Sequence, residues 1–164
     1  MLSCADSRVP AELVFGCDLG DLFVVRVAGN VCAPSLVGSV EYAAETFGTQ
    51  LVVVLGHTRC GAVTATIDAL TTGERPGSPN IDDIVERIAP AVSGLVGRGL
   101  GRDALVAAAV RANVRHASDH LRHGSHLLAG RVGAGKLVVV GAEYSLETGV
   151  VSFLELPAAL AAAA

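Results

Sequence analysis

Two short runs hold most of the residues in this chain that could do chemistry. The first is Cys4-Ala5-Asp6-Ser7-Arg8, and the second is His57-Thr58-Arg59-Cys60. Together they offer two thiolates and an imidazole, beside a carboxylate and a guanidinium. Two cysteines and one histidine form a ligand set used at catalytic zinc centres, where a fourth position stays open for water or substrate. The runs therefore predict a zinc site made by Cys4, His57 and Cys60.

Asp6 and Arg8 lie two residues apart, close enough for a bidentate pair in which the carboxylate keeps one oxygen free. Beside a zinc-bound water, that oxygen would accept a hydrogen bond and hold the water in one orientation. The alternative is a surface ion pair that contributes only about 0–1 kcal/mol to stability. Taken by themselves, the two residues favour this alternative.

Strands and helices alternate along the chain. Apolar, β-branched runs at 22–28, 51–55 and 136–140 predict strands, and the first two are bounded by glycine and predicted to be buried on both faces. Thr148-Gly149 before the run 150–154 predicts a hairpin that adds an antiparallel edge strand. Helical patterns occupy 10–15, 35–47, 62–70, 81–96 and 102–122. The order predicts an α/β fold with a mostly parallel sheet of about four to five strands flanked by helices.

The predicted elements bring the three ligands to one place. His57 follows the strand 51–55, and Cys60 precedes a helix that begins near Gly61, so one turn presents both side chains on the same side. Cys4 would arrive from the carboxyl end of the neighbouring strand. Open α/β folds place ligand sites at this edge of the sheet.

Composition bounds the class of protein. The chain has 164 residues, of which 51% are hydrophobic and 17% charged, so we expect a single domain over residues 1–164. A mean hydropathy of +0.54 predicts that some apolar surface is buried in a homodimer or tetramer. The segment 71–80 is the clearest loop, and the alanine-rich stretch 158–164 is expected to be a frayed tail.

Several classes of partner and setting are disfavoured. The net charge of −4 and an aromatic content of 4% argue against a nucleic-acid surface. Membrane spanning needs roughly 20 consecutive apolar residues, and no stretch approaches that length. The four cysteines are better explained as metal ligands and bystanders than as disulfides, and the start lacks a signal-peptide pattern. We therefore expect a cytoplasmic protein.

The two motifs and their surroundings resemble those of the β-class carbonic anhydrases. That family's Cys-x-Asp-Ser-Arg and His-x-x-Cys-Gly motifs match residues 4–8 and 57–61, and the similarity extends through 9–12, 25–30 and 38–43. The resemblance implies a zinc lyase that interconverts carbon dioxide and bicarbonate with one Zn²⁺ per chain. It also implies that Cys4, His57 and Cys60 are the ligands and that Asp6 with Arg8 is the catalytic pair.

Family members also carry N-terminal helices and most of a first strand before the first cysteine. Only three residues precede Cys4 here, so the comparison implies an N-terminally truncated domain with a first strand of about three residues. In some members the aspartate leaves its arginine and becomes a fourth zinc ligand. The absence of tryptophan, which lines the bicarbonate pocket of those members, favours an Asp6 that stays paired with Arg8.

Other functions remain open at this level. Similar scaffolds hydrolyse carbonyl sulfide or carbon disulfide, and a non-catalytic zinc module of a larger protein or a redox-sensing thiol domain are further alternatives. His116, His120 and His123 share one side of a predicted helix, but the interleaved charged residues favour a solvated face over a metal site. Cys17 and Cys32 match no ligand and are interpreted as small buried residues.

Overall fold

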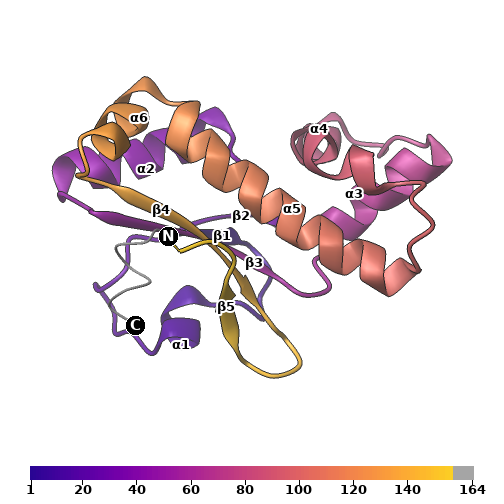
Figure 1. Cartoon of the computed structure of the whole chain (residues 1–164), viewed down its shortest axis with the longest axis horizontal. Coiled ribbons are helices and arrows are strands. Elements are labelled where there is room, and N and C mark those ends of the chain that lie inside the picture. The colour runs from indigo at the N-terminus through magenta and orange to yellow at the C-terminus, as the bar shows by residue number, and fades with distance from the viewer. Residues whose placement is uncertain (157–164) are drawn as a thin grey trace.

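The architecture is a single mixed sheet, seen in a computed structural model that describes residues 1–156. Its strands are β1 (Leu2–Cys4), β2 (Val25–Val27), β3 (Leu51–His57), β4 (Val138–Tyr144) and β5 (Val151–Phe153). They lie in the order β2-β1-β3-β4-β5 (Figure 1). The first four strands are parallel, and β5 is antiparallel to β4. The predicted α/β class and antiparallel edge strand are confirmed.

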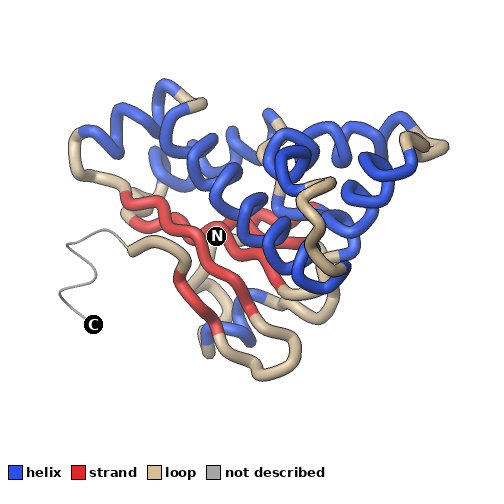
Figure 2. Tube along the Cα trace, turned by 45° about the vertical axis from the view of Figure 1, so that its right-hand side comes forward, coloured by secondary structure: helices blue, strands red, loops and turns tan. Residues whose placement is uncertain are grey.

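Helices cover both faces of this sheet unequally. They are α1 (Ala11–Phe15), α2 (Pro34–Thr46), α3 (Gly61–Thr72), α4 (Pro79–Val92), α5 (Arg102–His123) and α6 (His126–Gly133), with 3₁₀ turns η1 (Ala28–Asn30) and η2 (Ser93–Leu95). Figure 1 shows α2, α5 and α6 on one side of the strands and α1 on the other, and Figure 2 shows the same layers after a turn. Among the described residues, no helix has the length and apolar character needed to cross a bilayer.

Alternate residues of β3 pack in two different hydrophobic cores, one on each face of the sheet. Val52 and Val54 pack in the cluster under α2, α5 and α6, which includes Leu121. Val53 and Leu55 pack in the cluster on the α1 side. Because consecutive side chains of a strand point to opposite faces, a strand buried on both sides needs a continuous apolar run, as found at 51–55.

Helix α5 packs close to the sheet because two strand positions lack a side chain. A Cβ atom on Gly56 would lie 2.5 Å from Cγ2 of Val114, and one on Gly141 would lie 2.8 Å from Cγ1 of the same valine. Val114 therefore fills the space that two neighbouring strands leave open. The close packing at Gly56 places α5 beside the end of β3, where His57 is the last residue of the strand.

The predicted strand at 22–28 is wrong in extent and in burial. Only Val25–Val27 is a strand, because β1 offers partners for these three residues alone, pairing Leu2 with Val25 and Cys4 with Val27. β2 is an edge strand, and Arg26 within it is exposed. An apolar run cannot by itself distinguish an edge strand from a central one.

Some other boundaries also differ from prediction. The strand predicted at 136–140 is β4, shifted to 138–144, and the helix predicted at 81–96 ends at Val92 before a 3₁₀ turn. Helix α6 was not predicted, because glycines surround it. Its start is nevertheless capped by Ser125, whose side chain accepts a hydrogen bond from Leu128 N–H. The tail predicted at 158–164 lies outside the described residues.

Candidate metal centre

Cys4, His57 and Cys60 meet at the carboxyl edge of the parallel strands. Cys4 is the last residue of β1, and His57 is the last residue of the adjacent β3. The two sulfur atoms and a ring nitrogen of His57 all lie within 4.8 Å of one another, and all three residues are buried. The predicted convergence of these side chains is therefore confirmed in the structure.

Cys60 reaches the cluster through a sharp turn. Arg59 has φ of +54°, a left-handed conformation that costs a non-glycine residue about 1–2 kcal/mol. Cys60 then takes an extended conformation as the N-cap of α3, and its carbonyl accepts the N–H of Thr64. The turn reverses the chain after β3 and directs the Cys60 side chain back toward His57.

The orientation of His57 is set by its neighbour. His57 Nδ1 lies 2.9 Å from the backbone oxygen of Thr58, which can only accept a hydrogen bond. Nδ1 therefore carries the proton, and Nε2 presents its lone pair. Nε2 is buried and has no hydrogen-bond partner among the described residues. A buried nitrogen lone pair without a partner is the feature expected of a metal ligand whose other ring nitrogen is held by the protein.

The two thiols interact strongly. Their sulfur atoms are 3.9 Å apart, and the interaction with Cys60 lowers the pKa of Cys4. The proximity of Cys4 and burial together raise the pKa of Cys60. One negative charge is thus easily formed here, whereas a second requires a compensating cation. Two thiolates and an imidazole suit zinc, so the residues fit that ion.

Hydrogen bonds from Gly29 and Arg26 also hold Cys4 in place. Gly29 donates its N–H to the Cys4 sulfur at 3.4 Å. Arg26 donates to the carbonyl oxygens of Cys4 and Asp6, at 3.0 and 2.5 Å. The sequence motifs assigned no role to the Gly29 amide, since a backbone donor leaves no trace in residue type. The guanidinium of Arg26 bridges the first motif to the edge strand β2.

Asp6 and Arg8 form the expected bidentate pair. Nε of Arg8 donates to Oδ1 of Asp6 at 2.9 Å, and Nη2 donates to Oδ2 at 2.7 Å. Both oxygens are therefore engaged, which corrects the expectation that one would be free of the arginine. Oδ1 also accepts the Arg8 N–H, whereas Oδ2 lies 3.8 Å from His57 Nε2. Arg8 holds the pKa of the Asp6 carboxyl well below its usual range, chiefly through its side-chain hydrogen bonds.

Comparison with known proteins identifies the family to which the chain belongs. The family model described as carbonic anhydrase matches residues 1–151. The chain belongs to the carbonic anhydrase family. It is 42% identical to carbonic anhydrase 2 of Mycobacterium tuberculosis over 151 residues, which cover 91% of this chain and 70% of that protein.

Solved structures place the chain in the β class of the carbonic anhydrase family. The β-carbonic anhydrase CcaA superposes with a TM-score of 0.84 and 25% identity, over 96% of this chain and 76% of that one. A chain from the crystal structures of two tetrameric β-carbonic anhydrases of Sordaria macrospora has the same fold, with a TM-score of 0.81 and 20% identity over 94% of this chain and 79% of that one. The resemblance read from the motifs is confirmed.

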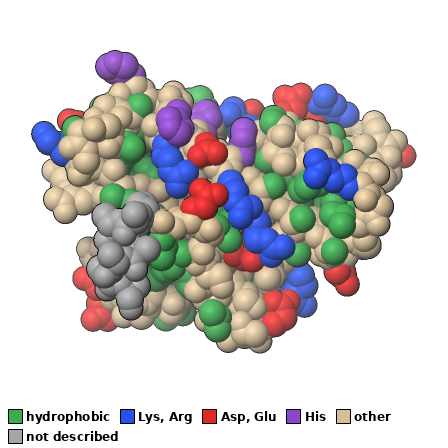
Figure 3. Space-filling view, viewed as in Figure 1, with side chains coloured by type: hydrophobic (Ala, Val, Ile, Leu, Met, Phe, Trp, Pro, Cys, Tyr) green, Lys and Arg blue, Asp and Glu red, His purple; other side chains and the backbone are tan. Residues whose placement is uncertain are grey.

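Residues outside the carbonic anhydrase motifs behave as the sequence suggested, with one exception. His116, His120 and His123 are exposed on α5, and Figure 3 shows histidine side chains on the surface among charged groups. Cys17 and Cys32 are free thiols that are only partly buried, whereas the sequence predicted buried residues.

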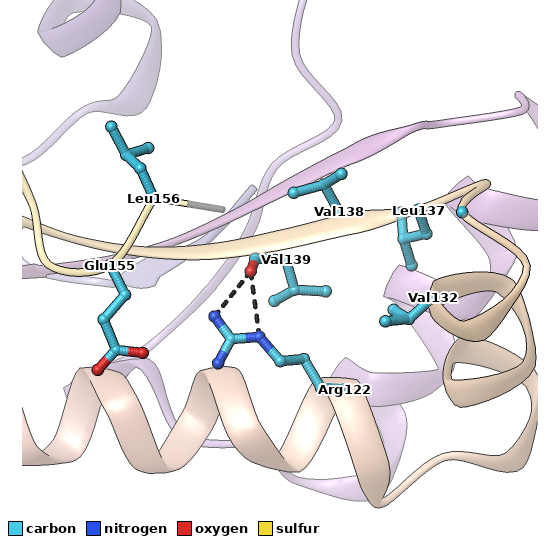
Figure 4. Close-up of a pocket in the computed structure, with 8 residues that line it drawn as sticks. Arg122, Val132, Leu137, Val138, Val139, Glu155 and Leu156 are labelled. Carbon is cyan, nitrogen blue, oxygen red and sulfur yellow. Dashed lines mark hydrogen bonds between the residues drawn. The ribbon is translucent and has the colours of Figure 1, made fainter. Parts of the chain in front are cut away.

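A pocket at the opposite end of β4 contains none of the predicted site residues. Its walls include Arg122, Val139 and Leu156 (Figure 4). Arg122 donates two hydrogen bonds to the carbonyl oxygen of Val139, at 3.2 and 2.8 Å, so its guanidinium is engaged within the fold. In this carbonic anhydrase family member, the candidate metal-binding side chains lie at the other end of the strands, around His57.

Proposed function

We propose that the chain binds one Zn²⁺ through Cys4, His57 and Cys60 and catalyses the reversible hydration of carbon dioxide to bicarbonate. The buried, unpartnered Nε2 of His57 facing two thiols carries the proposal. Membership of the carbonic anhydrase family supports it. When bound, zinc lowers the pKa of a coordinated water toward neutrality, which supplies a nucleophile at physiological pH.

The role proposed for Asp6 is to orient that nucleophile. Its carboxylate stays ionised at neutral pH, and Oδ2 is the oxygen nearer to His57. An ionised carboxylate accepts a hydrogen bond from a water or hydroxide and leaves the oxygen lone pair directed at carbon dioxide. Arg8 fixes the carboxylate plane through two parallel hydrogen bonds.

The Asp6–Arg8 pair favours a catalytic zinc site over a purely structural one. A structural zinc site uses four protein ligands. Within the part of the chain that the structure describes, the one group of three or more side chains that could hold a metal ion is Cys4, His57 and Cys60. Asp6 lies beside this group but is paired with Arg8. Three ligands beside an oriented acceptor favour an enzyme over a non-catalytic module.

The experiment combines metal analysis with stopped-flow hydration of carbon dioxide. Wild type is expected to hold one zinc per chain, and Asp6→Ala to keep zinc while losing about 10²-fold or more in kcat. Asp83→Ala is the matched control, because Asp83 makes a similar bidentate pair with Arg87 on α4. Stoichiometric zinc with no hydration by wild type would contradict catalysis.

We also propose one domain over residues 1–164, a homodimer or tetramer, and a cytoplasmic location. A shared sheet supports the single domain. Phe23, Tyr42 and Phe47 support association, because they pack together and each residue is at least 37% exposed. The Sordaria macrospora relatives are described as tetrameric. Analytical ultracentrifugation tests the oligomer, and a monomer at micromolar concentration would exclude it.

A further inference from the structure

The turn that carries His57 and Cys60 is held from outside by the hairpin between β4 and β5. This hairpin spans residues 145–150 and closes with Ser145 N–H donating to the carbonyl of Val150. Gly149, with φ of +70°, completes its tight turn. The motifs assigned no role to the hairpin, which lies about 90 residues after the turn in sequence.

Glu147 of this hairpin contacts Thr58 and Arg59, the two residues between His57 and Cys60 that form the ligand turn. Its Oε2 accepts the Thr58 hydroxyl at 2.7 Å, and its Oε1 pairs with Nε of Arg59 at 2.7 Å. Oε2 also accepts the hydroxyl of Ser145 at 3.2 Å, which ties the carboxylate to its own loop. Both oxygens are therefore occupied, and the carboxylate is fixed relative to the turn.

Thr58 is bonded through every polar group it has. Its N–H donates to Tyr144 O, and its hydroxyl donates to Glu147 while accepting the N–H of Leu146. Its carbonyl accepts the hydrogen bond from His57 Nδ1. The position of Thr58 thus decides which ring nitrogen of His57 is protonated and where Nε2 points.

Arg59 supplies the reason that the turn needs a support. Its left-handed backbone is strained, and strain of this kind persists only where surrounding contacts over-determine the conformation. Loss of the carboxylate would remove two of the contacts that hold this turn, and a change at Arg59 would move Cys60 relative to His57. The bonds from Glu147 fall on the residues directly between these two proposed ligands.

We propose that Glu147 is a positioning residue for the metal centre, acting on His57 through Thr58. This positioning role rests on the proposed function, in which Cys4, His57 and Cys60 bind zinc. Of the two contacts, the hydroxyl bond to Thr58 carries the effect, since Thr58 touches His57 directly. The Arg59–Glu147 pair is largely exposed, at 64% and 47% of the side chains, and exposed pairs contribute little.

The test measures transfer of zinc from the loaded protein to a chromophoric chelator. Glu147→Ala is expected to release zinc about tenfold faster than wild type, as is typical when a residue that orients a metal ligand is lost. Glu147→Gln keeps an oxygen that can accept the Thr58 hydroxyl, so its release rate should stay within about threefold of wild type. Glu147→Asp, which retains the charge on a shorter side chain, is expected to lie between them.

The matched control is Glu155→Ala. Glu155 forms an exposed pair with Arg115 at 3.1 Å, away from the ligand turn, so its loss should leave zinc release unchanged. A second readout is the absorption spectrum of the cobalt-substituted protein, whose thiolate and d–d bands should shift in Glu147→Ala and not in Glu155→Ala. Folding of each variant is checked by circular dichroism.

The outcomes separate this inference from the function on which it rests. A wild type that takes up no zinc overturns the proposed function, and the positioning role with it. A wild type that binds zinc, with Glu147→Ala releasing it at the rate of Glu155→Ala and with an unshifted cobalt spectrum, overturns the positioning role alone. If Glu147→Ala does not fold, Glu147→Asp decides, and a wild-type release rate in that variant overturns the role.

Discussion

The side-chain amide of Asn113 donates a hydrogen bond to the backbone carbonyl of Gly29 at 2.7 Å, in the interior of the protein. The N–H of the same glycine contacts the sulfur of Cys4. Helix α5 is therefore linked through the backbone of one residue, Gly29, to the first proposed zinc ligand. Asn113 is only 2% exposed, so water cannot replace this bond.

Replacing Asn113 by alanine is expected to lower the free energy of unfolding by about 1–3 kcal/mol, because a buried carbonyl loses its partner. Denaturant titration of both proteins measures the change. Ser118→Ala is the control, since the Ser118 hydroxyl donates to the carbonyl of Val114 within its own helix. Equal losses in the two variants would contradict a specific role for the Asn113 bond.

Gly56→Ala is expected to destabilise the protein by about 1–3 kcal/mol through overpacking. The added Cβ would lie 2.5 Å from Cγ2 of Val114, so the strand and α5 would have to separate. Val114→Ala removes that methyl group and should recover part of the loss in the double variant. A double-mutant cycle from thermal unfolding measures the coupling, and simple additivity would show that the two positions do not compete for space.

Arg8→Lys is expected to lower kcat by about tenfold or more while zinc content is unchanged. Lysine keeps the positive charge but cannot donate the two parallel hydrogen bonds that orient the Asp6 carboxylate. Stopped-flow hydration gives the rate, and metal analysis gives the zinc content. Arg87→Lys, at the similar pair on α4, should retain wild-type activity.

Cys32 is expected to resist alkylation. Burial raises the pKa of its thiol to about 12, so almost none is ionised at pH 8. Iodoacetamide should label it at least about a hundredfold more slowly in the native protein than in denaturant, as peptide mass spectrometry would show. Comparable labelling rates would show that the folded protein does not raise the pKa of this thiol.

The raised pKa of Cys32 also predicts how the stability of the protein changes with pH. The folded pKa is above that of an unfolded thiol, about 8.5. The protonated thiol therefore favours the folded state fully below pH 8.5, and this contribution is lost as pH rises toward 12. The stability of wild type relative to Cys32→Ala should fall between pH 8 and 11, and a constant difference would show that the thiol is not desolvated.

The chemistry of the site was readable in advance because it lies in two short runs. Residue type and spacing predicted the three proposed ligands, and two adjacent parallel strands ending at Cys4 and His57 predicted where these side chains meet. The bidentate Asp6–Arg8 pair was equally local, since only one residue separates its members. Strand 22–28 was predicted less well, because edge or central placement depends on which residues of another strand lie beside it.

The sequence by itself determined the donor atoms, the alternation of elements and the sheet edge where the donors gather, because these follow from residue type and short-range pattern. Only the tertiary structure decided what surrounds them. Glu147 reaches Thr58 from the hairpin after β4, and Asn113 reaches Gly29 from α5. Such contacts join residues more than 80 positions apart, and their distance in space is set by the packing of the whole sheet and its helices.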